Sequence, residues 1–159
     1  MSAAAHAPSE PSVRLFRAPE PFEAAICTFT DGSFQLDKDG REAVLVSVEL
    51  DGGVEIDTCA FFPGRPKRWW REFLVATHLG DQALRHAQFL GRSVRLLTTP
   101  QDWIVSPEGA MVVLDWRCDL RAVFGDVPEI QCASEAMKKF LQTRLGAQVA
   151  HSYRITVAA

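Results

Sequence analysis

The sequence predicts an α+β fold: a small, mostly antiparallel barrel or curled sheet with two helices between its third and fourth strands. Three observations predict it. Apolar residues alternate with a period of two in several segments, a helical period separates the third from the fourth of these, and Gly, Pro and Asp residues divide the segments. The expected strands cover residues 22–30, 43–50, 54–62, 93–99 and 110–120, and the expected helices cover 66–78 and 81–90.

The first three strands form a continuous antiparallel unit in this prediction. Strand 22–30 alternates from Phe22 to Ile26, and a long polar loop over 30–42 follows it. Val44, Val46, Val48 and Leu50 line one face of the second strand, and Asp51-Gly52-Gly53 is a strong hairpin signal. The third strand should therefore pair with the second and point Val54, Ile56, Thr58, Ala60 and Phe62 inward.

The two helices follow from turn signals and periodicity. Pro66 suits a first helical turn, and Trp70, Phe73, Leu74 and Thr77 then fall on one helical face. Gly80 can end this helix, Asp81 can cap the next one, and Gly91 stops it.

The remaining chain supplies two barrel strands and a tail. Strand 93–99 resumes the period of two, and 110–120 is a long, clearly amphipathic strand after the turn at 106–109. In the tail, Ser134 and Glu135 open a helix that Gly146 closes, and residues 149–157 alternate like a last strand. We therefore expect a disordered tail over 1–12 and one OB-like domain over 13–159, with 122–159 as a C-terminal helix–strand extension.

Composition excludes several classes of protein. The 159 residues suffice for one domain with a sizeable core, and no apolar run approaches the roughly 18 residues of a membrane span. The N-terminus lacks the basic region and the apolar region that a secretory signal requires. The four cysteines are far apart in the sequence and form no CxxC pair. We expect reduced thiols and a cytoplasmic protein.

Charge is distributed unevenly. Residues 20–57 hold ten acidic and two basic residues, a balance of −8, whereas residues 63–95 hold seven basic and two acidic residues, a balance of +5. Such a division favours an oriented contact with a charged partner, although two solvated faces would explain it equally well.

The segment 64–71 is the strongest candidate site because it holds four cations and two indoles in eight residues. Phosphates need Lys or Arg, and unpaired bases stack on aromatic rings. If Trp70 faces the core, Trp69 lies at a neighbouring helical position and can be exposed. The alternative is a solvated basic helical turn with both indoles buried. The predicted nucleic-acid-binding residues are Arg65, Lys67, Arg68, Trp69, Arg71, Arg92 and Arg95.

An acidic surface opposes this interpretation. Glu49, Glu55 and Asp57 fall on the predicted outward face of the second and third strands, where OB barrels often bind nucleic acid. Three carboxylates there would repel phosphates, so this face could instead engage a basic protein partner.

Signals for an enzyme are weak. The chain has no HExxH, GxSxG, P-loop or GxGxxG motif, so we expect no catalytic residues and no cofactor. Cys59 with His78 or His86 could form a thiol–imidazole pair, and Asp57, Asp115 and Asp119 could surround a divalent cation. A packed thiol and ordinary solvated strands explain these residues more simply, and we expect no metal.

The layout from Phe22 to Trp116 resembles small OB-fold single-stranded-DNA-binding-like proteins of phages and plasmids. The resemblance rests on the Asp-Gly-Gly hairpin, the tryptophan-containing segment 67–77, and Leu90-Gly91-Arg92-Ser93-Val94 leading into a strand. It implies a non-catalytic accessory protein that binds single-stranded nucleic acid. The alternative is a protein–protein interaction module that uses the acidic hairpin face or the C-terminal extension.

Overall fold

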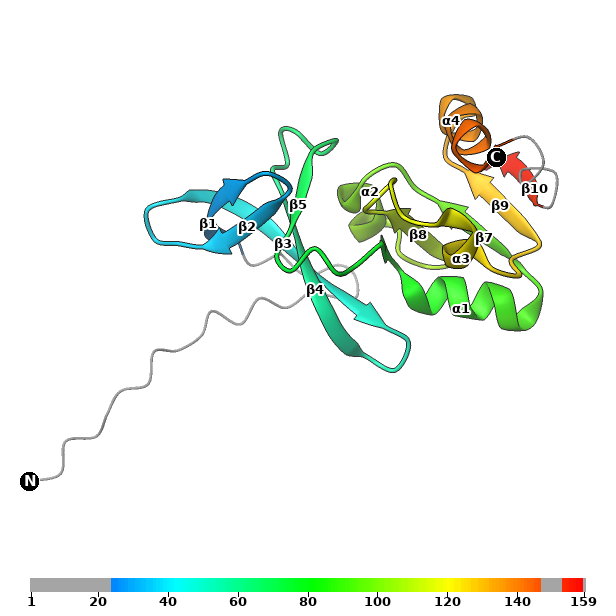
Figure 1. The fold of residues 1–159 in the computed structure, drawn as a ribbon, viewed down its shortest axis with the longest axis horizontal. Coiled ribbons are helices and arrows are strands. Elements are labelled where there is room, and N and C mark those ends of the chain that lie inside the picture. The colour runs from blue at the N-terminus through cyan, green and yellow to red at the C-terminus, as the bar shows by residue number, and fades with distance from the viewer. Residues whose placement is uncertain (1–23, 147–152, 159) are drawn as a thin grey trace, which may run out of the picture.

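The computed structural model describes residues 24–146 and 153–158, and it contains two five-stranded sheets that lie side by side (Figure 1). One sheet closes into a barrel, and helices cover the other. The α+β class with a closed five-stranded barrel is thus confirmed. The expectations for residues 1–12 and for the beginning of strand 22–30 lie outside the described residues. No helix in the described ranges is long and apolar enough to cross a membrane.

The barrel contains β1 (Ala24–Thr30), β2 (Ser33–Leu36), β3 (Arg41–Leu50), β4 (Val54–Phe61) and β5 (Trp69–Arg71), in the spatial order β1-β2-β5-β4-β3. Neighbouring strands are antiparallel except β2 and β5. The predicted hairpin is confirmed, because β3 and β4 pair from Val44↔Phe61 to Leu50↔Val54 around Asp51–Gly53.

The second sheet has the order β10-β9-β7-β8-β6, with bounds His78–Leu79 (β6), Ser93–Leu96 (β7), Ala110–Val113 (β8), Glu129–Cys132 (β9) and Arg154–Val157 (β10). β10, β9, β7 and β8 are parallel to one another, and the edge strand β6 pairs antiparallel with β8. Helices between the parallel strands provide the long crossovers that parallel pairing requires.

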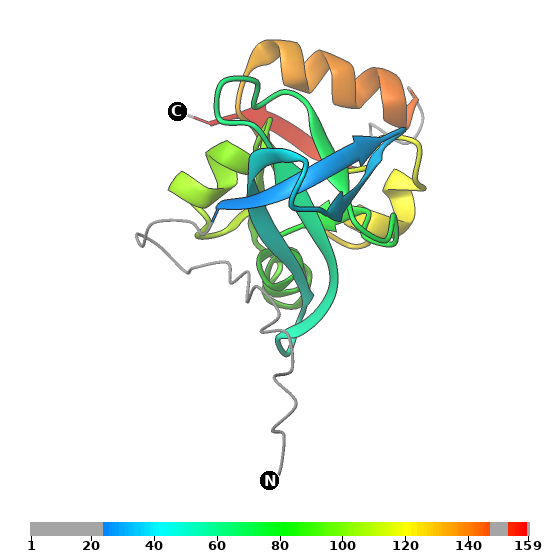
Figure 2. The same cartoon turned by 90° about the vertical axis from the view of Figure 1, so that its left-hand side faces the viewer.

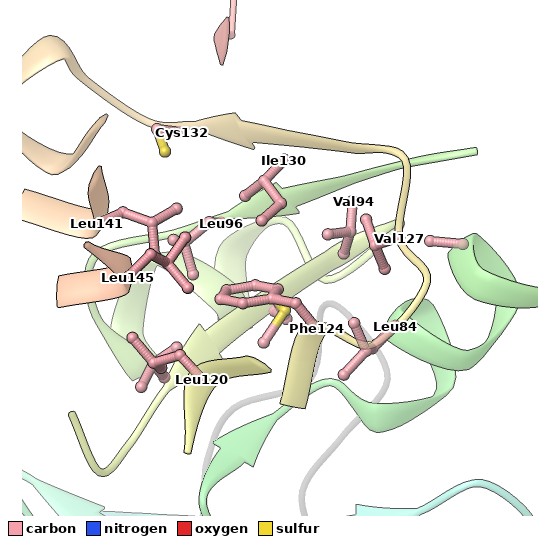
Figure 3. Close-up of a cluster of buried hydrophobic side chains, with 13 residues drawn as sticks. Leu84, Val94, Leu96, Leu120, Phe124, Val127, Ile130, Cys132, Leu141 and Leu145 are labelled. Atoms are coloured by element: carbon pink, nitrogen blue, oxygen red, sulfur yellow. The ribbon is translucent and has the colours of Figure 1, made fainter. Parts of the chain in front are cut away.

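Three helices cover one face of this sheet: α1 (Asp81–Leu90), α3 (Leu120–Phe124) and α4 (Glu135–Leu145). They pack on the side chains that β7, β8 and β9 direct to that face, among them Val94, Met111 and Ile130. Phe124 lies in the middle of this cluster (Figure 3).

The barrel and α2 (Pro100–Val105) cover the opposite face of the sheet. Figure 2 shows the barrel in front of the sheet in this direction. Their shared core contains Val46, Val48, Cys59 and Phe61 from β3 and β4, together with Val112 from β8. The valine face of β3 that the sequence suggests as barrel interior therefore packs against the second sheet. The barrel interior is formed instead by Ala25, Cys27, Phe34, Ala43, Leu45, Ala60 and Trp70.

Two predicted elements are wrong. Residues 66–78 do not form a helix, because Trp69–Arg71 pairs with β4 as β5, and a loop then leads to β6. Consequently no helix lies between barrel strands. The long strand 110–120 ends at Val113 and is followed by a turn in which Asp115 accepts the N–H groups of Arg117 and Cys118. Asp119 then accepts the N–H groups of Arg121 and Ala122 and so caps α3.

Other predictions are confirmed in part. Strand 93–99 exists as β7, but both it and β8 belong to the second sheet, not to the barrel. The polar loop 30–42 contains β2, and Pro100–Val105 forms α2 behind a Thr99 capping box. Helix α1 ends at Gly91 as expected, but Gly80 and not Asp81 is its N-cap.

In the tail, α4 begins after its N-cap Ser134 and ends before Gly146, as the sequence predicts. Leu141 and Leu145 are buried, Tyr153 and Ile155 are half-buried, and Phe140 is exposed. β10 pairs in parallel with β9, so the extension completes the second sheet.

Candidate nucleic-acid interface

Four aromatic rings close one end of the barrel. Phe29 from β1 has its ring centroid 5.0 Å from that of Phe62 and 4.5 Å from that of Trp70, and it also packs on Phe34. Phe62 and Trp70 meet edge to face at 5.4 Å. These rings come from β1, β2, β5 and the residue after β4, so barrel closure itself brings them together.

Two guanidinium groups lie over these rings. The guanidinium carbon of Arg41 is 4.5 Å from the centroid of Phe62, and that of Arg68 is 4.9 Å from the centroid of Trp70. Both arginines are exposed at the residue level. Such pairs are held by the electrostatic attraction of a cation to an aromatic face. The side chains of Arg41 and Arg68 therefore lie against the aromatic cluster.

Two further cations lie in the same connection. The N–H of Arg65 donates to the carbonyl of Phe62, and the N–H of Arg68 donates to the carbonyl of Arg65, so a tight turn leads from the aromatic cluster to Arg68. Arg65 and Lys67 are exposed on this turn. We call Arg41, Arg65, Lys67 and Arg68 the cationic barrel end.

The cationic barrel end is not neutralised locally. Among residues 24–146 and 153–158, no carboxylate oxygen lies within 4.0 Å of any of its four cationic groups, because the ion pairs found there involve other residues. Unpaired cations of this kind attract polyanions.

The structure thus brings together Arg65, Lys67 and Arg68 of the predicted site, and it excludes Arg71. The Arg71 side chain is buried, and its Nη2 donates to Asp115 Oδ2 at 3.0 Å. Nη1 donates to the carbonyls of Leu74 and Ala76. Because its side chain is buried and both terminal nitrogens have partners inside the fold, Arg71 is not available to a ligand.

The remaining predicted residues lie elsewhere. Trp69 is half-buried in the core between barrel and sheet, where its Nε1 donates to the carbonyl of Leu114 at 3.1 Å. Arg92 follows the C-cap of α1, and Arg95 lies in β7 of the second sheet. Arg95 Nη2 is bonded to the Ser106 carbonyl and hydroxyl and to the Glu108 carbonyl. Arg95 is therefore used to hold the connection between α2 and β8.

Of the three carboxylates predicted to form an acidic face, two remain exposed. Asp57 is fully buried, and its carboxylate accepts the backbone N–H groups of Thr58, Phe73, Val75 and Ala76 at 2.8–2.9 Å. Glu49 and Glu55 remain exposed. The register between β3 and β4 shifts at Val48 and Glu49, whose partners are Asp57 and Glu55, so Ile56 of β4 is the extra residue. The alternation of the sequence does not reveal this irregularity.

The three aspartates proposed as metal ligands have separate roles. Asp57 binds backbone N–H groups, and Asp119 caps α3. A side-chain hydrogen bond from Arg117, with further contributions from Arg71, lowers the pKa of Asp115 to about 2. In the described part of the chain, no group of three His, Cys, Asp or Glu side chains could hold a metal ion.

The thiol–imidazole pair is not formed either. Cys59 is buried in the shared core, and burial raises the pKa of its thiol. The ring of His78 is bonded through Nδ1 to the Thr77 hydroxyl and through Nε2 to Asp81, at 2.9 and 3.0 Å. Burial lowers the pKa of His78. This series of hydrogen bonds connects α1 to the β3–β4 hairpin, because Asp81 also accepts the N–H of Asp51.

Sequence reasoning missed Arg41, Phe62 and Trp70 as members of the site. Arg41 follows the polar loop, and the antiparallel register of β3 and β4, with Val44 opposite Phe61, brings it to Phe62. Comparison of the chain with protein-family models, with curated proteins and with solved structures found no match.

Proposed function

We propose that this protein is a non-catalytic accessory protein that binds single-stranded nucleic acid at the cationic barrel end. The observation that carries the proposal is the convergence of four cations, Arg41, Arg65, Lys67 and Arg68, around an aromatic barrel end, none of which forms an ion pair within residues 24–146 and 153–158. The proposed site keeps Arg65, Lys67 and Arg68 of the residues expected from the sequence and adds Arg41.

The chemistry of the site fits a flexible, unpaired strand. Arg65 and Lys67 supply charge for phosphates, and this contribution does not depend on base sequence. Arg41 and Arg68 are exposed, and an unpaired base can stack on a guanidinium plane. A cytoplasmic location, as expected from the sequence, agrees with this role.

The test is a fluorescence anisotropy titration of labelled oligo-dT at low and moderate salt. Wild-type protein should bind at low salt and lose affinity as salt rises, because binding releases counterions. The double variant Arg65→Ala/Lys67→Ala should bind more weakly, and its slope of log affinity against log salt should fall by roughly 0.7 for each phosphate contact removed.

Arg92→Ala is the matched control, since it removes an exposed cation outside the cationic barrel end. Its affinity should equal that of the wild type. Absence of wild-type binding at low salt would refute the function. Equal losses for Arg92→Ala and the double variant would refute this site. Circular dichroism of each variant should remain that of the wild type.

A further inference from the structure

The loop between β5 and β6 presents three consecutive apolar side chains to solvent. Phe73, Leu74 and Val75 are 63%, 47% and 62% exposed. Leaving large apolar side chains in water is unfavourable, and contiguous exposed apolar residues commonly mark a binding surface. We call Phe73–Val75 the apolar tip.

Buried charges hold the apolar tip in shape. The carboxylate of Asp57 accepts the N–H groups of Phe73, Val75 and Ala76, each at 2.9 Å. From the other side, the buried guanidinium of Arg71 donates to the carbonyls of Leu74 and Ala76. Burying a carboxylate and a guanidinium is costly, and here they fix a loop whose own side chains gain little burial.

The backbone at the tip is strained as well. Leu74 has φ +58°, and it is the one non-glycine residue with positive φ among the described residues. A branched side chain rarely adopts this conformation, and strained residues of this kind occur preferentially at functional sites. The anchored backbone holds Leu74 outward in a single shape, which lowers the entropy cost of binding.

The charges around the tip restrict what can cover it. Glu72 precedes it directly, and Leu74 lies beside the β1–β2 turn, since its Cδ2 is 3.9 Å from the position that a Cβ on Gly32 would take. Asp31 is exposed in that turn, and Arg117 nearby is paired with Asp115. Carboxylates flanking the tip would be repelled by nucleic acid and by an anionic membrane, and two copies meeting tip to tip would oppose like charges.

From these observations we propose that the apolar tip docks into an apolar pocket, bordered by Lys or Arg, on a different protein. This site is separate from the cationic barrel end, because the two lie at opposite ends of β5 (Figure 1). It has the character of an interface hot spot: a preformed aromatic and aliphatic anchor with a polar, charged rim.

The test places the photo-crosslinking residue benzoylphenylalanine at position 73 in the full chain, expressed in its own cells. Position 89 is the matched control, because Phe89 is 87% exposed on α1, away from the loop. We expect one discrete adduct with another protein from position 73 and none of that size from position 89. Mass spectrometry should place the crosslinked residue among apolar residues bordered by Lys or Arg.

Two further variants test the chemistry of the contact. Glu72→Lys should lower the adduct yield several-fold, whereas Glu108→Lys, an exposed acidic residue elsewhere, should leave it unchanged. Val75→Ser should also lower the yield but leave the melting temperature as in wild type, because Val75 is largely exposed.

Other outcomes overturn the proposal. An adduct of the chain with itself, together with concentration-dependent association in sedimentation velocity, would identify a second copy as the occupant. Flotation of the purified protein with phosphatidylcholine–phosphatidylglycerol vesicles that Val75→Ser abolishes would identify a membrane. Absence of a position-specific adduct, or equal yields with Glu72→Lys, would show that no such pocket is engaged.

Discussion

Replacing Asp57 by Asn tests whether one buried carboxylate holds the loop between β5 and β6. Oδ1 accepts the N–H groups of Thr58 and Phe73, and Oδ2 accepts those of Val75 and Ala76. The amide of Asn keeps one acceptor oxygen and directs an N–H₂ donor at the other two N–H groups.

The expected cost follows from the bonds lost. Hydrogen bonds to a charged group contribute about 1.5–3 kcal/mol each, and two of them disappear while the amide opposes two donors. We therefore expect Asp57→Asn to lower the free energy of unfolding by about 3–5 kcal/mol, a large part of the stability of an ordinary domain.

Urea denaturation followed by tryptophan fluorescence measures this change. Asp126→Asn is the control, because Asp126 is exposed and should change stability by less than about 0.5 kcal/mol. Hydrogen exchange should also show faster exchange at Phe73, Val75 and Ala76 in Asp57→Asn. A variant within about 1 kcal/mol of wild type would refute the anchoring role of this carboxylate.

Three further predictions concern the pH dependence, the loop and the tail. Hydrogen bonds from Arg117 and the charge of Arg71 lower the pKa of Asp115 to about 2 from 3.8, so its contribution to stability is complete above about pH 4 and is lost as pH falls toward 2. Urea midpoints should therefore fall less over that interval in Asp115→Asn, and parallel losses would contradict this. Leu74→Gly relieves a positive φ and should leave the free energy of unfolding unchanged or raise it by up to about 1 kcal/mol, whereas a thermal midpoint several degrees lower would disprove strain. Deleting residues 134–159 exposes β9 and the side chains that pack on α4, and should give aggregates by size-exclusion chromatography with light scattering; a monomer with wild-type melting temperature would show that the tail is dispensable.

Local patterns predicted the elements whose signals are complete in the sequence. Period-two alternation and Asp51-Gly52-Gly53 identify the β3–β4 hairpin, and Ser134 and Gly146 bracket α4. The prediction of a helix over 66–78 was wrong because the spacing of Trp70, Phe73 and Leu74 also fits a helix. In the fold, Trp70 fills the barrel and Leu74 faces solvent, since pairing with β4 and the charges of Asp57 and Arg71 outweigh helical propensity.

The part of the candidate site whose residues are neighbours in the sequence was predicted. Arg65, Lys67 and Arg68 belong to one short turn, so composition alone identifies them. Arg41 joins them because β3 begins at Arg41, before the predicted start of that strand, and pairs with β4 beside Phe62. Arg71 leaves them through its ion pair with Asp115, which is 44 positions away along the chain, and such a pairing has no signature in a single sequence. For the same reason, the strands after α1 were assigned to the barrel although they build a second, parallel sheet.

The β3–β4 hairpin contributes side chains to two hydrophobic cores, the barrel interior and the core between the barrel and the second sheet. Along Ala43–Val48, successive side chains turn alternately into the barrel and into the core beneath the second sheet, and each is buried or half-buried. Neither the barrel nor the second sheet should therefore be soluble as a separate fragment, because separating them would expose an apolar face of the β3–β4 hairpin to water. The amide protons of this strand should be among the last in the molecule to exchange, through global opening alone. Barrel and sheet should accordingly melt in a single step.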